Sequence, residues 1–66
     1  MKFRLKEQRE KQHIDQLTLS ERSGIGRITI SRLETGAQTD ATAGTLVALA
    51  DALHCSVADL LDLDAQ

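Results

Sequence analysis

Glycines divide the middle of the chain into two short segments, each of a length that suits one helix. Asp15 has the side-chain chemistry of an N-cap, and the segment Gln16–Ser23 follows it. Gly24 then supplies the permissive backbone that ends a helix. After a short link, the segment Arg27–Thr35 runs up to Gly36, which ends it in the same way. The chain is therefore expected to fold around two consecutive short helices joined by a tight link.

The apolar residues of these segments indicate which side of each helix faces the core. Leu19 is the inward residue of the first segment, and Ile14 can form the N-terminal half of a hydrophobic staple. In the second segment Ile30 and Leu33 lie three residues apart, which places them on one helical face. Two helices with a link of about three residues between them make the helix-turn-helix arrangement.

A further helix is expected before this pair. The residues from Lys2 to about Gln12 are mostly strong helix formers, with Phe3 and Leu5 on the apolar side. Phe3 is the sole aromatic residue of a 66-residue chain that has no proline, so the core must be aliphatic. Such a composition favours helices over sheets, and a chain of this length suits one domain without a deep substrate cavity.

Two more helices are expected after the pair. The first would follow Thr42, and its apolar residues have the i, i+3, i+4, i+7 spacing of an amphipathic helix: Leu46, Leu49, Ala50 and Leu53. The second would follow Ser56 and is short, with three apolar residues on one face: Val57, Leu60 and Leu61. The prediction is an all-α fold, a five-helix bundle in which residues 1–66 form a single domain.

The composition also excludes several classes of site and location. Cys55 is the only cysteine, which excludes an internal disulfide and a cysteine-rich zinc site. No metal, cofactor or small-molecule substrate is expected. The chain has no apolar stretch long enough for a membrane helix or a signal peptide, so the expected location is cytoplasmic, without a membrane partner.

No catalytic constellation is expected either. Asp51, His54 and Cys55 are close in sequence, but a lone cysteine at a helix end is more often a small buried apolar group than a nucleophile. The link Gly24–Gly26 lacks the third glycine and the preceding strand of a dinucleotide site. The chain is therefore predicted not to be an enzyme.

The net charge of −2 hides a strong asymmetry along the chain. Residues 1–36 carry all eight basic groups and five acidic ones, which gives +3. Residues 37–66 carry five aspartates and no lysine or arginine, which gives −5. One part of the molecule is therefore expected to face phosphate groups while the other part faces away from them.

A series of residues, spread over nearly the whole chain, follows the order that is typical of one known protein family. They are Arg9, Gln16, Leu19–Ser20, Gly24–Ile25, Thr29–Gly36, Leu46, Leu49–Ala50, Leu53, Ser56 and Leu60–Leu61. Their order resembles the phage Cro/cI repressor family, also called the xenobiotic-response-element (XRE) family, over residues 3–62, and Ile30–Gly36 is the most specific piece. The resemblance implies a five-helix Cro/cI-like bundle that binds operator DNA, usually as a homodimer. It also implies that Arg9 and Glu34 match the buried ion pair of that family.

Helical geometry sorts the residues of Arg27–Thr35 without reference to any family. If Ile30 and Leu33 point inward, steps of 100° place four residues outward, with Arg27 projecting from the first turn. The four are Ile28, Ser31, Arg32 and Thr35. An arginine fork matches guanine in the major groove, and an apolar side chain matches a thymine methyl, so Arg27, Ile28, Ser31 and Arg32 are the predicted base-reading residues. The alternative is two solvated charges and a scattered apolar residue.

A second group of residues is predicted to hold the DNA backbone. Gln16 begins its helix, where the helix N-terminus and a side-chain amide can hold a phosphate together, as the matching glutamine does in the family. The other predicted phosphate contacts are Arg22, Thr29, Thr35 and Thr39. For these the alternative is a solvated charge or an ordinary hydroxyl.

The combined prediction is a double-stranded DNA-binding transcriptional regulator. Repression is the expected outcome, because so short a chain has little surface for both operator and polymerase. Two subunits are expected on a pseudo-palindromic operator, with some C-terminal apolar residues at the two-fold contact: Val57, Leu60, Leu61 and Leu63. The alternative is a protein-interaction module with weak DNA binding, such as an antitoxin or adaptor, and the acidic second half favours it.

Overall fold

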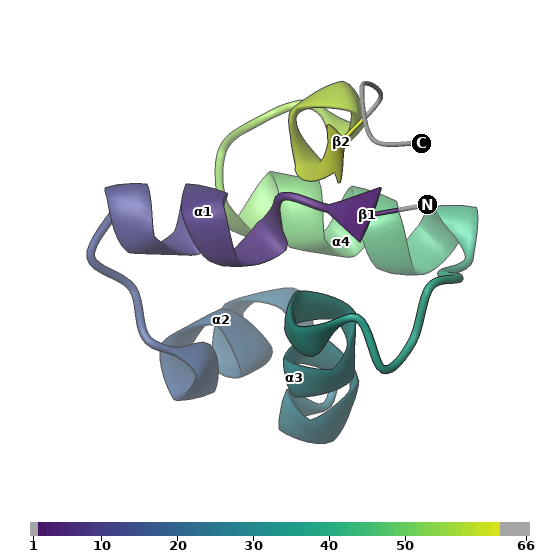
Figure 1. Cartoon of the computed structure of the whole chain (residues 1–66). Coiled ribbons are helices and arrows are strands. Elements are labelled where there is room, and N and C mark those ends of the chain that lie inside the picture. The colour runs from purple at the N-terminus through teal and green to yellow at the C-terminus, as the bar shows by residue number, and fades with distance from the viewer. Residues whose placement is uncertain (1, 63–66) are drawn as a thin grey trace.

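The computed structural model of the protein describes residues 2–62, which form four α-helices, one 3-10 helix and a pair of very short strands (Figure 1). In chain order these are β1 (Lys2–Phe3), α1 (Leu5–Lys11), α2 (Gln16–Ser23), α3 (Arg27–Thr35), α4 (Ala43–Ala52), the 3-10 helix η1 (Val57–Leu60) and β2 (Leu61–Asp62). The predominantly helical fold agrees with the prediction from the sequence. Among these residues, no helix has the length and apolar composition that a membrane crossing requires.

Local signals explain where α2 and α3 begin and end. The Asp15 carboxylate accepts a hydrogen bond from the backbone N–H of Thr18 at 2.7 Å, which caps α2. Gly24 (φ 75°) and Gly36 (φ 85°) end α2 and α3 in the left-handed conformation. Thr42 caps α4 through the N–H of Thr45. The bounds predicted for α2 and α3 are those that the structure has.

The two ends of the chain differ from the prediction because they pair with each other. Lys2 and Phe3 lie antiparallel to Asp62 and Leu61, and the N–H of Arg4 donates to the carbonyl of Leu60 at 2.7 Å. The pairing draws the first residues into an extended conformation, so α1 begins at Leu5 and not near the start of the chain.

The expected fifth helix is one turn of 3-10 helix and not an α-helix. Ser56 and Asp59 cap η1 reciprocally, each side chain accepting a hydrogen bond from the other residue's N–H. Leu61 then leaves the helical conformation to join β2. The predicted count of five helices is therefore not confirmed, since the described residues hold four α-helices and this short turn.

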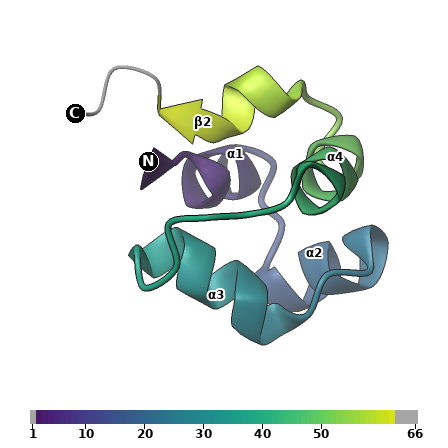
Figure 2. The same ribbon diagram turned by 90° about the vertical axis from the view of Figure 1, so that its right-hand side faces the viewer.

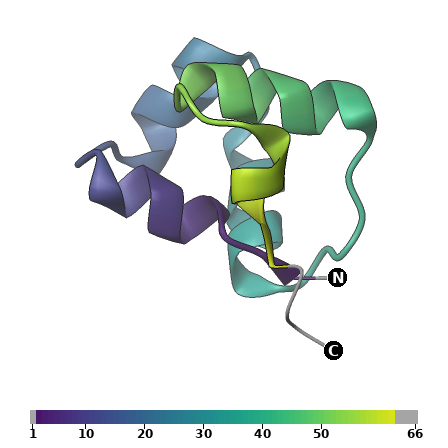
Figure 3. The same cartoon turned by 90° about the horizontal axis from the view of Figure 1, so that it is seen from above.

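The helices are arranged in levels around an aliphatic core. Figure 2 shows α2 and α3 as one outer layer, α1 and α4 above it, and η1 with β2 on the far side. Seen from above, η1 lies between α1 and α4 (Figure 3). Six side chains are less than 2% exposed, Leu5, Leu19, Ile30, Leu49, Leu53 and Leu60. Burying each one contributes about 1.5–3 kcal/mol, and together they fix α2 and α3 on the rest of the molecule.

Two helices end on histidines with positive φ. At the end of α1, His13 (φ 56°) donates its N–H to the Glu10 carbonyl, and Ile14 donates to the Arg9 carbonyl. This is the Schellman arrangement, in which the left-handed position usually holds glycine. His54 (φ 52°) ends α4 in the same way.

Candidate nucleic-acid interface

The link between α2 and α3 is held by hydrogen bonds that set the relative orientation of the two helices. The Ser20 hydroxyl donates to the carbonyl of Ile25 at 2.7 Å, and the N–H of Ile25 donates to the Ser23 hydroxyl at 3.1 Å. Ile25 also packs against the core. The link is thereby fixed to α2 and to the core, so α3 begins in a defined direction on the surface of the molecule.

The outward face of α3 carries the residues predicted to read bases. Ile30 and Leu33 are buried, whereas Ile28 is 77% exposed. The other exposed large apolar residues, Leu17 and Val47, have smaller exposed fractions. Arg27 and Arg32 are exposed, and Ser31 and Thr29 are half-buried. Two arginines and one apolar side chain therefore project from a rigid, outer helix, a combination that suits the edges of bases in a major groove.

The first turn of α3 has no side-chain cap. Gly26 occupies the N-cap position, so no side-chain oxygen accepts the amides that begin the helix. These N–H groups point along the helix axis at its positive end, next to Arg27. This end of α3 is therefore suited to a negatively charged group.

The residues predicted to contact phosphate are spread around this layer. Arg22, Thr35 and Thr39 are exposed and Thr29 is half-buried. The Thr35 hydroxyl donates to the Arg32 carbonyl at a long 3.4 Å. Gln16 is the one whose side chain is joined to the Arg9–Glu34 pair, because its Nε2 donates to Glu34 Oε1 at 3.1 Å.

Arg9 and Glu34 form a bidentate ion pair between α1 and α3. Arg9 Nε donates to Glu34 Oε2 at 2.8 Å, and Arg9 Nη2 donates to Glu34 Oε1 at 2.9 Å. The side chains are 12% and 3% exposed, respectively. Burial by itself raises the pKa of Glu34, but the hydrogen bonds from Arg9 and Gln16 and the charge of Arg9 outweigh it and leave this pKa below its ordinary value. The carboxylate is therefore ionised and ties α3 to α1.

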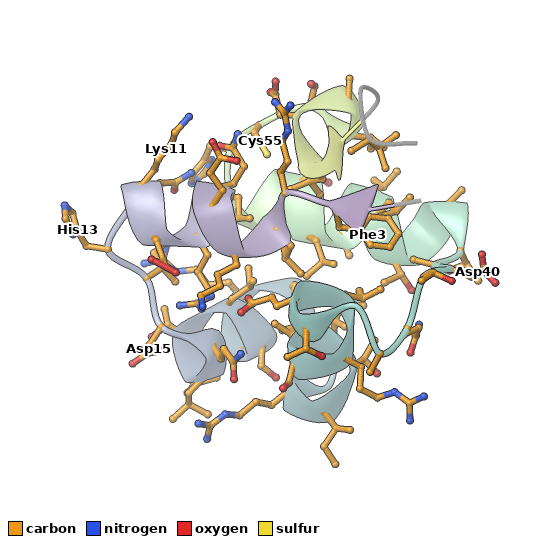
Figure 4. The ribbon with its side chains drawn as sticks, viewed as in Figure 1. Phe3, Lys11, His13, Asp15, Asp40 and Cys55 are labelled. Atoms are coloured by element: carbon orange, nitrogen blue, oxygen red, sulfur yellow. The ribbon has the colours of Figure 1, made fainter. Side chains whose placement is uncertain are left out.

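Asp15 places a negative charge beside the predicted phosphate contact at Gln16, whereas the sequence predicts Asp15 only as a helix cap. Figure 4 shows Asp15 at the outer edge of the molecule, beside α2. Hydrogen bonds from Thr18 are the main reason that the pKa of Asp15 lies below its usual value, and the charges of Arg27 and Arg9 add to this effect. The preference for Asp at an N-cap predicts the cap from the sequence. The effect of Arg27 on Asp15 cannot be predicted in this way, because it depends on how α3 packs against α2.

The residues considered for catalysis are not arranged as a metal site. Among residues 2–62, no three histidine, cysteine or acidic side chains are grouped as metal ligands would be. Cys55 lies on the side of the molecule away from α2 and α3 (Figure 4), and burial raises the pKa of its thiol. The thiol is therefore protonated near neutral pH and is a poor nucleophile.

A comparison with known protein families agrees with this geometry. The sequence pattern of a family described as helix-turn-helix matches residues 5–60, from α1 to the end of η1. No curated protein and no solved structure gives a significant match to the chain. A match over most of the chain establishes the family, whose members bind DNA and are not known as enzymes. The chain therefore belongs to the Cro/cI-type, or XRE-type, helix-turn-helix family of DNA-binding regulators.

Proposed function

We propose that the protein is a transcriptional repressor that reads a specific operator with the outward face of α3. The observation that carries this proposal is the contrast along α3 between the buried Ile30 and Leu33 and the exposed Ile28, Arg27 and Arg32. A helix held by its inner face presents its outer side chains in fixed positions. Fixed positions are what base-specific recognition requires.

The side chains of this face match particular base edges. The guanidinium groups of Arg27 and Arg32 can each donate two hydrogen bonds to O6 and N7 of guanine. Ile28 lies between them in sequence and suits a thymine methyl group, while the Ser31 hydroxyl can contact either kind of base.

The contacts to phosphate are proposed at Gln16 and at four flanking residues, Arg22, Thr29, Thr35 and Thr39. Gln16 stands at the N-terminus of α2, where backbone amides and its own side-chain amide favour a phosphate oxygen. Such contacts set the position of the protein on the duplex and carry no sequence information.

Two subunits are proposed to bind one operator. The molecule measures 31 × 20 × 20 Å, so two copies fit on neighbouring half-sites whose centres are one helical turn, about 34 to 36 Å, apart. Leu60 is buried within the subunit, while Val57 and Leu61 stay partly exposed and remain available for a two-fold contact. Leu63 lies outside the described residues. Bound to an operator, such a dimer would repress by excluding other proteins from that stretch of DNA.

The test is selection of bound duplexes from a random pool, followed by titration of variants against the selected operator and its single-base changes. Arg27→Ala and Arg32→Ala should each relax the preference at one base pair per half-site by about 1–3 kcal/mol. Replacing the contacted thymine with uracil should weaken the parent protein and barely affect Ile28→Ala. Lys11→Ala is the control, because Lys11 is exposed on α1, away from the α2 and α3 layer (Figure 4).

One observation favours a second function, a protein-interaction module such as an antitoxin or adaptor. Residues 37–66 hold no lysine or arginine, and the α3–α4 loop thus lacks a permanent cation for phosphate. Phosphate contacts impose a steep dependence of affinity on salt, and protein contacts do not. If Arg27→Ala and Arg32→Ala leave affinity and preference unchanged, and binding to duplex has no salt slope, the interaction module becomes the better account.

A further inference from the structure

We propose that the buried Arg9–Glu34 pair positions Gln16 for DNA, so that Glu34 acts on DNA affinity through the Gln16 side chain. This inference rests on the proposed function, in which Gln16 contacts a phosphate. Glu34 itself is a positioning residue, because its side chain is enclosed between α1 and α3 and is only 3% exposed.

The carboxylate of Glu34 is held from two sides. Oε2 accepts from Arg9 Nε at 2.8 Å, while Oε1 accepts from Arg9 Nη2 at 2.9 Å. The remaining arm of the guanidinium, Nη1, donates to the carbonyl of Ile14 at 2.9 Å, just before α2 begins. The position of Oε1 is therefore set by α1, by α3 and by the start of α2 together.

This fixed oxygen determines the orientation of the Gln16 amide. Gln16 Nε2 donates one N–H to Oε1 at 3.1 Å, which leaves the second N–H of the same nitrogen for another acceptor. Within the described part of the chain, Gln16 makes no other side-chain hydrogen bond. Because the first bond restricts rotation of the amide, the second N–H has a defined direction before DNA arrives.

Such an arrangement raises affinity for DNA because the Gln16 side chain loses less rotamer freedom when DNA binds. A free glutamine side chain has several rotamers and loses that freedom when it contacts a phosphate. A glutamine side chain that Glu34 already holds has lost this rotamer freedom on folding, so it does not lose it again when DNA binds. If the Gln16–Glu34 bond served stability alone, breaking it would change unfolding and leave the Gln16 contribution to DNA binding unaltered.

A double-mutant cycle on the folded protein distinguishes these roles. The pair is removed by Arg9→Met together with Glu34→Leu, since apolar side chains of similar volume often preserve or raise stability when they replace a buried ion pair. This replacement leaves the net charge unchanged, so the electrostatic attraction to DNA stays the same. Operator binding is measured by fluorescence anisotropy, at a temperature where circular dichroism shows every variant folded, for the parent, Gln16→Ala, the pair replacement and the triple variant.

We expect Gln16→Ala to weaken binding about three- to tenfold. The pair replacement should weaken binding by a similar factor, and Gln16→Ala should then add little to it. Arg22→Ala is the matched control, because Arg22 is a proposed phosphate contact without a bond to the pair, and its effect should be the same in both backgrounds. The salt slope of the pair replacement should equal that of the parent.

Two results overturn different parts of the account. If Gln16→Ala weakens binding equally with and without the pair, the positioning role is wrong and the phosphate contact stands. If Gln16→Ala binds like the parent, the phosphate contact itself is wrong. Should the pair replacement fail to fold, Glu34→Asp takes its place in the cycle, because it keeps the charge opposite Arg9 and withdraws the oxygen from Gln16. Full affinity in Glu34→Asp then overturns the inference, and a loss that Gln16→Ala does not deepen supports it.

Discussion

At the scale of single residues, removal of the Glu34 side chain would leave the buried charge of Arg9 and the amide of Gln16 without their partner. The Glu34 carboxylate is ionised, enclosed and hydrogen-bonded to Arg9 and Gln16. Truncating one member of a buried pair leaves the other charge without a partner, which costs far more than the net contribution of the intact pair. Lys6 and Glu10 form a contrasting pair at 3.8 Å on the surface of α1, with side chains 63% and 57% exposed.

Glu34→Ala is expected to lower the free energy of unfolding by about 3–5 kcal/mol, a large share of the stability of a small domain. Glu10→Ala is the control, because an exposed pair of this kind contributes about 0–1 kcal/mol. Urea denaturation of the three proteins measures both values. Equal midpoints for Glu34→Ala and the parent would mean that the buried pair carries no stability.

The same pair makes stability depend on acid pH. The pKa of Glu34 is lower in the folded protein than in the unfolded chain, so its contribution is complete above the unfolded pKa, about 4.3, and is lost as pH falls through the lower folded value. Unfolding free energies measured from pH 7 to pH 2 should therefore fall less steeply below about pH 4 when Arg9→Met and Glu34→Leu replace the pair. Parallel curves for the two proteins would contradict the lowered pKa.

Asp15 is expected to limit DNA affinity. Its carboxylate caps α2 next to the proposed phosphate contact of Gln16 and repels a phosphate there. Asp15→Asn retains a good N-cap and removes the charge, so operator affinity should rise, most clearly at low salt, while thermal stability changes little. Asp59→Asn is the control, because Asp59 also caps a helix, η1, on the far side of the molecule. Equal affinity changes in the two variants would indicate an effect of net charge alone.

At the scale of the elements, the histidines that end α1 and α4 occupy positions that suit glycine. A side chain with a Cβ is strained by about 1–2 kcal/mol in the left-handed region. The two helix ends also lie together, since the Gln12 amide donates to the Leu53 carbonyl. The strain is thus stored at one end of the molecule, outside the α2 and α3 layer.

His13→Gly and His54→Gly are each expected to raise the free energy of unfolding by about 0.5–1 kcal/mol, after the greater freedom of glycine in the unfolded chain is subtracted. His13→Ala and His54→Ala are the controls, because alanine keeps the Cβ and with it the strain. Thermal unfolding measures all four. An equal gain from alanine and glycine would show that imidazole contacts, and not backbone strain, are responsible.

The bounds of a helix can be predicted from the sequence when the residues that set them lie within or next to that helix. Asp15, Gly24 and Gly36 act on their own segments, so the bounds of α2 and α3 follow from the sequence, and so does the outward face of α3. The start of α1 and the shortness of η1 depend on the pairing of Lys2–Phe3 with the other end of the chain, which no periodicity reveals. In the same way, the Arg9–Glu34 pair is expected only from family resemblance, and the bond from Gln16 to Glu34 has no signal in the sequence.

At the scale of the whole molecule, the proposed dimer requires a surface that joins its two subunits on an operator. Leu60 belongs to the core of a single subunit. Of the residues that the sequence predicts at the two-fold contact, Val57 and Leu61 therefore remain as candidates among the described residues. Both are partly exposed on the η1 and β2 side, away from the α2 and α3 layer (Figure 2).

Val57→Glu is expected to weaken binding to the full operator and to leave binding to an isolated half-site unchanged, because a charge at a two-fold contact affects only the second subunit. Ala58→Glu, at an exposed neighbour in the same turn, is the control. Anisotropy on the two duplexes gives the affinities, and sedimentation gives the number of subunits bound. Equal binding of Val57→Glu and the parent to the full operator would place the contact elsewhere.

The pairing of Lys2–Phe3 with Leu61–Asp62 has a topological consequence. With its described ends side by side, as Figure 3 shows, the backbone follows a nearly closed circuit in space. In a circular permutant of this 66-residue chain, a short linker joins its two ends and new ends are opened elsewhere, which proteins tolerate best at exposed polar loops. The α3–α4 loop around Thr39 and Asp40 is such a place, since both residues are exposed. A permutant opened there keeps α1, α2 and α3 in unbroken succession, so Thr39 is the one proposed DNA contact at the new ends and the others keep their order along the chain.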